Sequence, residues 1–153
     1  MKGGKTEDTR GAEVDAKTKI LVVDDDEVVR LSHQRSLAGA HCHVVAVWNG
    51  DEAMRAMEQQ PFDVILLDLR MPGTDGLAVL RMIKQRWPET EVVIVTGYPS
   101  LETVKEAVEA GACDYLTKPV GPDEVIHAAT GAATRKQWAL RRVPDQIEAR
   151  RMP

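Results

Sequence analysis

The sequence has no apolar run that approaches membrane-spanning length, and its first 18 residues lack the apolar core of a secretory signal peptide. It has only two cysteines, Cys42 and Cys113, which are too few and too far apart for a disulfide framework. These absences argue against a membrane-spanning protein and against a disulfide-stabilised secreted domain. We therefore predict a protein of a reducing compartment, the cytoplasm, with no membrane partner.

The sequence also lacks a helix-turn-helix pattern, an ATPase motif and any internal repeat. With 153 residues, of which 43% are apolar and 29% charged, the chain has the size and composition of one globular domain with a core of its own. We expect either a stand-alone domain that acts by protein contact or one domain of a longer protein.

Charge is unevenly distributed along the chain. Residues 1–18 carry four basic and four acidic side chains, whereas residues 134–153 carry six basic and two acidic ones, a net charge of +4. Because the whole chain has a net charge of −4, the residues between these two segments carry −8. Such an acidic body repels a phosphate backbone, so direct binding of nucleic acid by this chain is not expected.

Three parts of the chain differ in composition. Residues 1–18 are polar, contain three glycines and show no periodicity, so they are predicted to form a disordered N-terminal lead. Residues 19–140 alternate between short apolar runs and amphipathic stretches, and they form the predicted domain. Residues 141–153 form a basic C-terminal tail.

Five strands, each followed by a helix, are predicted within the domain. The strands are 19–23, 43–47, 64–67, 92–95 and 113–116. The helices are expected to begin at the capping residues Asp26, Asn49, Asp75 and Ser100 and, for the last helix, at Pro122. The last helix is expected to end near Leu140, because Pro144 breaks any continuation.

Short connections between alternating strands and helices give right-handed crossovers in a parallel sheet. The predicted fold class is α/β, a doubly wound five-stranded parallel sheet of order 2-1-3-4-5 (flavodoxin-like) with helices on both faces. In the helix that follows Ser100, Leu101, Val104 and Val108 share one face.

Polar residues gather at the carboxyl ends of the predicted strands, where open α/β sheets bind ligands. Asp24 and Asp25 follow the first strand, Asp68 follows the third, and Thr96 and Lys118 end the next two. Three carboxylates at one place repel one another, and a hard divalent cation with oxygen ligands, such as Mg²⁺, would relieve the repulsion. With a lysine and a hydroxyl nearby, these are the parts for phosphoryl transfer to a carboxylate.

Four motifs at these strand ends resemble the receiver domain of two-component response regulators. They are VVDD at 22–25, LLDLRMPGTDG at 66–76, VTG at 95–97 and YLTKP at 115–119, in the family's order and spacing. The resemblance covers roughly residues 19–140. It implies a phosphoacceptor rather than an enzyme, with self-phosphorylation from a phosphodonor and autodephosphorylation as its only chemistry. The phosphoryl group would come from a sensor histidine kinase or a phosphotransfer protein.

The resemblance implies how such an acceptor switches. Asp68 would accept the phosphoryl group, with Thr96 and Lys118 as its catalytic partners and the Lys118–Pro119 peptide in the cis form. Thr96 would then shift toward the phosphoryl group and Tyr115 would rotate inward, which changes the surface near the last two helices. The readout would be a partner, an output domain or a phosphorylation-dependent homodimer. The TGY sequence and the long last helix resemble receivers that precede transcriptional output domains.

The resemblance also implies a metal site and a control of the phosphoryl lifetime. Mg²⁺ would be bound by Asp25, Asp68 and the backbone carbonyl of Arg70, and by Asp24 mainly through water. In receivers, the residues two beyond the acceptor and two beyond the threonine flank the path by which water attacks. Here these residues are Arg70 and Tyr98, whose bulk is expected to slow hydrolysis.

Three other kinds of site fit parts of the sequence. Asp24 and Asp26 have the spacing of a haloacid-dehalogenase-like phosphatase with Asp24 as nucleophile, although Asp26 is better placed to begin a helix. A flavin-binding module of the same topology would need a phosphate loop after the first strand, where three aspartates repel phosphate. His41 and His43 flank Cys42 and would share a strand face, but a metal site needs further ligands.

Overall fold

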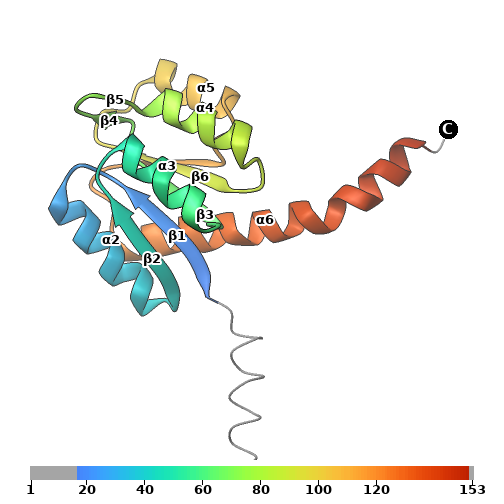
Figure 1. Ribbon diagram of the computed structural model, residues 1–153, viewed down its shortest axis with the longest axis horizontal. Helices are drawn as coiled ribbons and strands as arrows, with labels where there is room; N and C mark the ends of the chain where they lie inside the picture. The colour runs from blue at the N-terminus through green and yellow to red at the C-terminus, as the bar shows by residue number, and fades with distance from the viewer. Residues whose placement is uncertain (1–16, 152–153) are drawn as a thin grey trace, which may run out of the picture.

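The computed structural model describes the backbone of residues 17–151 and the side chains of residues 17–137. The predicted N-terminal lead therefore lies almost wholly outside the described residues, and Thr18 already belongs to the first strand. Five parallel strands form one sheet, in the order β2-β1-β3-β6-β7 (Figure 1). Their bounds are β1 Thr18–Val23, β2 Cys42–Val47, β3 Val64–Leu67, β6 Glu91–Thr96 and β7 Asp114–Thr117. The predicted order, 2-1-3-4-5 when only these five strands are counted, is confirmed.

Helices cover both faces of this sheet (Figure 1). One layer is α2 (Glu27–Gly39) and α6 (Pro122–Arg151), and the other is α3 (Gly50–Gln59), α4 (Gly76–Arg86) and α5 (Leu101–Glu109). Successive residues of a strand point to opposite faces, so β1 sends Ile20 and Val22 toward α2 and α6, and Leu21 and Val23 toward the other layer. This is why the strands appear in the sequence as continuous apolar runs.

The strand register brings several polar residues to the carboxyl end of the sheet. β1 and β3 are paired up to their last residues, so Asp24 and Asp68 leave the sheet side by side. β6 and β7 also end together, at Thr96 and Thr117, which places Lys118 at the same end. The backbone N–H groups of Asp24, Asp68 and Lys118 each donate to a carbonyl of the neighbouring strand, which fixes where their side chains start.

The helices begin where the sequence predicted. Asp26 caps α2, Asn49 caps α3, Asp75 caps α4 and Ser100 caps α5, and in each case a side-chain oxygen accepts backbone N–H groups of the first turn. Ser100 and Thr103 bond to each other reciprocally as a capping box. The use of Asp26 as a cap agrees with the prediction that it begins the helix.

A short hairpin precedes α4, where the sequence predicted only a turn. β4 (Arg70–Met71) and β5 (Thr74–Asp75) pair antiparallel across Pro72 and Gly73. Gly73 has a φ of +70°, which a residue without a side chain adopts readily, and proline followed by glycine suits the centre of such a turn. The hairpin holds Arg70 close to the end of β3.

α5 contributes less to the core than its apolar sequence suggests. Leu101 and Val108 are 86% and 61% exposed, and the buried residue of this helix is Ala107. None of the four residues of the edge strand β7 is fully buried, so the sheet offers this helix little apolar surface. The face that Leu101 shares with Val104 and Val108 is therefore largely open to solvent.

α6 is longer than predicted. The expected end near Leu140, with Pro144 as the break, is wrong, because the helix continues to Arg151. A proline inside a helix removes one backbone hydrogen bond but keeps a helical φ, and a bend can accommodate its ring. Figure 1 shows the last part of α6 curving as it leaves the body of the domain. Neither α6 nor any other helix within residues 17–151 is apolar enough, over a sufficient length, to cross a membrane.

Charged side chains attach α6 to the amino end of the sheet. Lys136 Nζ lies 2.8 Å from Asp63 Oδ1, and Asp63 also accepts a backbone N–H from β1 at 2.8 Å. Arg135 donates to the carbonyl of Cys113 at 3.4 Å. Asp63 directly precedes β3, and Asp68 directly follows it. The same strand therefore connects the attachment of α6 to the polar residues at the opposite end of the sheet.

Gly76→Ala should destabilise the domain, because a Cβ at this position would lie 2.5 Å from the Cα and 2.6 Å from the carbonyl oxygen of Leu69. These backbone atoms directly follow Asp68 and cannot give way without displacing its loop. We expect the free energy of unfolding in urea to fall by about 2 kcal/mol, as is typical of overpacking. Gly39→Ala is the control, because its Cβ meets nothing within 4 Å and alanine favours the helix by about 0.5 kcal/mol or more. Equal stabilities of the two variants would contradict the steric argument.

Candidate functional site

The structure brings Asp24, Asp25 and Asp68 together at the carboxyl end of the sheet. Asp24 and Asp68 are buried, with 2% and 4% of their surface exposed, while Asp25 is open to solvent. One carboxylate oxygen from each lies within 4.8 Å of the others. Oxygen donors in this number and spacing fit a hard divalent cation.

One lysine contacts both buried acids. Lys118 Nζ lies 2.7 Å from Asp24 Oδ2 and 3.2 Å from Asp68 Oδ2. Two buried carboxylates would repel each other strongly without a cation between them, and the ammonium group supplies that cation. The sequence predicted that these three side chains would meet, and in the structure Lys118 contacts both acids.

The remaining oxygens of the two acids are held by the backbone. Asp24 Oδ1 accepts the N–H of Asp26 at 2.9 Å, and Asp68 Oδ1 accepts the N–H of Arg70 at 3.0 Å. Arg30 of α2 adds a hydrogen bond at 2.7 Å to the backbone carbonyl of Asp24. These bonds fix the orientation of both carboxylates, and each still presents one oxygen to Lys118.

Burial raises the pKa of the Asp68 carboxyl. The N–H of Arg70 and the charge of Lys118 oppose the increase, while the charge of Asp24 adds to it. For Lys118, burial acts to lower the pKa, but the hydrogen bond and the attraction from Asp24, together with Asp68, outweigh it and the pKa rises. The lysine therefore stays protonated, and Asp68 is a poorly hydrated carboxylate, which is favourable for a nucleophile.

The two predicted switch residues lie on adjacent strands. Thr96 is buried at the end of β6, and its Oγ1 accepts the N–H of Tyr98 at 3.3 Å. Tyr115 is half-buried on β7, opposite Ile94 in the register, and its hydroxyl lies 3.2 Å from Thr103 Oγ1. Tyr115 therefore reaches the first turn of α5 in this structure. The sequence did not point to Thr103.

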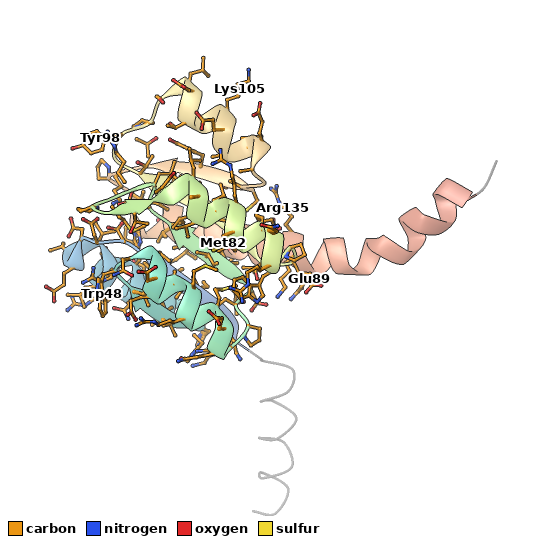
Figure 2. The ribbon with its side chains drawn as sticks, turned by 45° about the horizontal axis from the view of Figure 1, so that its top comes forward. Trp48, Met82, Glu89, Tyr98, Lys105 and Arg135 are labelled. Carbon is orange, nitrogen blue, oxygen red and sulfur yellow. The ribbon has the colours of Figure 1, made fainter. Side chains whose placement is uncertain are left out.

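Arg70 and Tyr98, the two residues predicted to flank the path of the attacking water, contact each other. The guanidinium carbon of Arg70 lies 4.6 Å from the centre of the Tyr98 ring, a cation–π arrangement. Both residues line an open cavity of about 590 Å³ together with Asp25 and Met71. Tyr98 stands at the end of the molecule opposite Glu89 and Arg135 (Figure 2). The pair therefore stands beside the acid cluster, across the loops that follow β3 and β6.

Other predictions about single residues have clear outcomes. The Lys118–Pro119 peptide is cis, as the resemblance implied. Within residues 17–137, Asp24, Asp25 and Asp68 are the one group of three suitable side chains close enough to hold a metal, and His41, Cys42 and His43 are not part of such a group. Cys42, between the two histidines, is buried in the core.

His33 is a residue that sequence analysis missed. It is buried on α2, four residues before the buried Leu37, and its Nδ1 has no hydrogen-bond partner among the described residues. It lines a cavity of about 400 Å³ that also contacts Ser32 and Lys118. Burial lowers the pKa of the imidazole, which Asp24 partly opposes and Lys118 reinforces. The i, i+4 spacing with Leu37 was the available signal that this histidine faces the core.

These features define an α/β domain with an acid cluster able to hold a metal, and with a lysine that contacts two of the three acids, at the carboxyl end of a doubly wound sheet. The family model of the response regulator receiver domain matches residues 20–130, which is most of the chain. The chain belongs to this family, the phosphoacceptor domains of two-component signalling. The haloacid-dehalogenase-like alternative finds no support, and Lys118 already binds the carboxylate of its expected nucleophile, Asp24.

Its relatives are longer proteins. The chain is 42% identical over 118 residues to the DNA-binding transcriptional regulator NtrC of Salmonella typhimurium, which covers 77% of this chain and 25% of the relative. It is 38% identical over 105 residues to the response regulator protein PilR of Pseudomonas aeruginosa, with 69% and 24% covered. The chain thus spans about a quarter of the length of the curated relatives it matches.

Solved structures agree with the family. A CheY-like response regulator receiver domain protein from Methanospirillum hungatei superposes with a TM-score of 0.78 at 27% identity, over 80% of this chain and 98% of that one. NtrX from Brucella abortus gives a TM-score of 0.78 at 31% identity, over 85% of this chain and 29% of NtrX. Similarity to single receivers and to part of a longer protein supports residues 20–130 as a folding unit.

His33→Leu should reduce the loss of stability on acidification. The folded-state pKa of His33 lies below the ordinary value of 6.5, so the unfolded chain takes up a proton first as the pH falls. The stability that depends on neutral His33 is fully present above pH 6.5 and is lost as the pH falls through this value toward the lower folded-state pKa. Leucine at this buried position has no proton to bind and no unpaired nitrogen, so it should also stabilise the protein by about 1 kcal/mol.

The measurement is the free energy of unfolding in urea, taken at several pH values on either side of 6.5. The exposed His43→Gln serves as the control, and it should follow the parent curve. The raised pKa of Asp68 is common to all three proteins, so its effect cancels in the differences. Parallel pH curves for the parent and His33→Leu would show that His33 does not carry this dependence.

Proposed function

We propose that this domain takes a phosphoryl group onto Asp68 from the phosphohistidine of a sensor histidine kinase or a phosphotransfer protein. The observation that carries the proposal is the contact of the Lys118 ammonium with both buried carboxylates, Asp24 at 2.7 Å and Asp68 at 3.2 Å. A phosphoryl group on Asp68 adds negative charge at this point, and a flexible lysine beside it can neutralise that charge. Beyond self-phosphorylation and autodephosphorylation, we propose no enzymatic activity.

The transfer forms a bond between an Asp68 oxygen and phosphorus and breaks the phosphorus–nitrogen bond of the phosphohistidine, whose imidazole leaves with the electron pair. The Arg70 N–H holds one Asp68 oxygen and so orients the carboxylate for attack. The Lys118 ammonium can move from the carboxylates to the phosphoryl oxygens, because its stem is long and flexible. The Thr96 hydroxyl would donate to another of these oxygens.

We propose Mg²⁺ as the cofactor, bound by Asp25, Asp68 and the backbone carbonyl of Arg70, and by Asp24 through water. When bound, the ion would neutralise charge on the transferring phosphoryl group. The spacing of the three carboxylates within 4.8 Å and the open position of Asp25 support this assignment. The charge of Lys118 leaves the cluster less repulsive but still acidic, which suits a cation that binds reversibly.

The signal would pass through Thr96 and Tyr115. A shift of Thr96 toward the phosphoryl group opens space for Tyr115 to rotate inward, and the surface near α5 and α6 repacks. Such a switch needs a difference of a few kcal/mol in how phosphorylation stabilises the two states. The output would be a partner protein, a further domain or a phosphorylation-dependent homodimer.

The NtrC relative is by name a DNA-binding transcriptional regulator, and we propose a transcriptional output for this receiver as well. The proposed receiver unit is residues 19–140, followed by the basic tail at 141–153. We propose that the protein acts in the cytoplasm, without membrane or nucleic-acid contact by this acidic domain itself.

Phosphorylation should occur at Asp68 and nowhere else. Incubation with a small phosphodonor such as acetyl phosphate and Mg²⁺ should add the mass of one phosphoryl group to the intact protein. The gain should vanish in Asp68→Asn and in the absence of a divalent cation, because nucleophile and charge neutralisation are then missing. Asp24→Asn should still be labelled, though more slowly. Full labelling of Asp68→Asn combined with none of Asp24→Asn would instead support the phosphatase-like nucleophile.

Arg70 and Tyr98 should lengthen the life of the phosphoryl group. Their cation–π pair stands beside the acid cluster and would obstruct an in-line water, so Arg70→Ala and Tyr98→Ala should each hydrolyse faster. Shielding worth about 1.4 kcal/mol corresponds to a tenfold change in the rate of autodephosphorylation at saturating Mg²⁺. Tyr98→Phe keeps the aromatic ring and should behave like the parent. If both alanine variants are as slow as the parent or slower, the shielding explanation is wrong, while Asp68 remains the proposed acceptor.

A further inference from the structure

Tyr115 is attached to the first turn of α5 in this structure. Its hydroxyl lies 3.2 Å from Thr103 Oγ1, and the ring packs partly against the core layer formed by α3, α4 and α5. The contact joins the edge strand β7 to α5, a helix that buries only the small Ala107 in the core. A hydrogen bond at this place therefore restrains both the ring and the start of the helix.

The Thr103 hydroxyl is already used by the cap of α5. It accepts the backbone N–H of Ser100 at 3.2 Å, and it lies 3.1 Å from the Ser100 carbonyl and 2.9 Å from the Ser100 hydroxyl. A hydroxyl has one proton to donate and two lone pairs to accept with. If its proton goes to Ser100, one lone pair takes the Ser100 N–H and the other remains for Tyr115. Tyr115 is then the donor, and every hydrogen-bonding position of Thr103 is filled.

We propose that Thr103 is a positioning residue that holds Tyr115 in the orientation seen here, which we assign to the outward, resting state of the switch, and so sets its resting balance. The inference rests on the proposed function, in which Tyr115 rotates inward when Asp68 is phosphorylated. Rotation of the ring out of the orientation seen here would break the 3.2 Å contact with Thr103, so the contact stabilises this orientation alone. An interaction made in one of two states shifts the equilibrium toward that state by its own free energy.

The same contact gives rotation of Tyr115 a direct effect on the start of α5. When the tyrosine leaves, the cap loses one of the two donors to Thr103. This turn begins at Leu101, which is 86% exposed. The position of the exposed Leu101 side chain, and how well it is ordered, would thus depend on the orientation of Tyr115. One neutral hydrogen bond corresponds to a change of about fivefold in the ratio of outward to inward tyrosine.

The chain offers a direct probe, because it contains only two tyrosines, Tyr98 and Tyr115. Incorporation of 3-fluorotyrosine gives one fluorine environment for each, and Tyr98→Phe assigns the signal of Tyr115. In the unphosphorylated protein, Thr103→Val removes the hydroxyl but keeps the branched shape. We expect the Tyr115 signal to move toward its position in the phosphorylated parent, by an amount that corresponds to about a fivefold change in the ratio.

Two matched variants separate this role from helix capping. Thr103→Ser keeps a hydroxyl at the same position and should leave the Tyr115 signal where the parent has it. Ser100→Ala removes the capping side chain of α5 but keeps the Thr103 hydroxyl, so it should lower stability without moving the Tyr115 signal. If Ser100→Ala moves the signal as far as Thr103→Val does, the effect comes from loss of the cap and the inference is wrong.

A double-mutant cycle gives a second readout. In the rate of labelling by acetyl phosphate, Thr103→Val should act on the parent but have no further effect on Tyr115→Phe, which already lacks the tyrosine hydroxyl. Additive effects would overturn the inference, as would a Tyr115 signal unchanged in Thr103→Val. These outcomes leave labelling of Asp68 intact, whereas failure of the parent to be labelled at Asp68 would refute the proposed function itself.

Discussion

The arrangement of side chains at the carboxyl end of this sheet depends on one ammonium group, that of Lys118, which contacts two buried carboxylates. Burying one unpaired charge costs several kcal/mol, and two like charges side by side cost more. Lys118 makes the burial of Asp24 and Asp68 tolerable by contacting both. Because an ammonium on a flexible stem can exchange one anionic partner for another, the interaction that stabilises the resting site also leaves it ready for a new negative group.

That interaction depends on features spread over the chain. β1 and β3 must end at the same level to set the two acids side by side, and β7 must end beside β6 to bring in the lysine. Gly76 must lack a side chain so that the loop after Asp68 can pass close to the start of α4. The hairpin of β4 and β5 follows at once, which places the Arg70 N–H on the free oxygen of Asp68. Local backbone geometry thus prepares the site before any ligand arrives.

Much of this architecture could be predicted from the sequence because its signals are local. Apolar runs that end in acids, with capping residues a few positions later, determine where each strand stops and each helix begins. Once the strand order is known, the meeting of Asp24, Asp68 and Lys118 follows from parallel pairing alone. The cis peptide before Pro119 followed from the family resemblance, not from propensity.

Other features depend on packing between distant segments and could not be predicted. The exposure of Leu101 follows from how little apolar surface the edge strand offers, which no periodicity in α5 reveals. The contact of Tyr115 with Thr103 joins a strand to a helix, and the contact of Arg70 with Tyr98 joins a strand to a loop, in each case between elements that are not paired in the sheet. α6 continues through Pro144, although a proline inside a helix usually breaks or kinks it.

The attachment of α6 also gives the domain a mechanical asymmetry. A helix of 30 residues is about 45 Å long, and Lys136 ties it to Asp63 roughly midway, at the amino end of the strand that leads to Asp68. The half beyond this tie is about 20 Å long. In a rigid helix, a change of tilt at the tie displaces each later residue in proportion to its distance from the tie. A small adjustment of the strand that carries Asp63 and Asp68 would therefore move the far end of α6 more than it moves the ion pair itself.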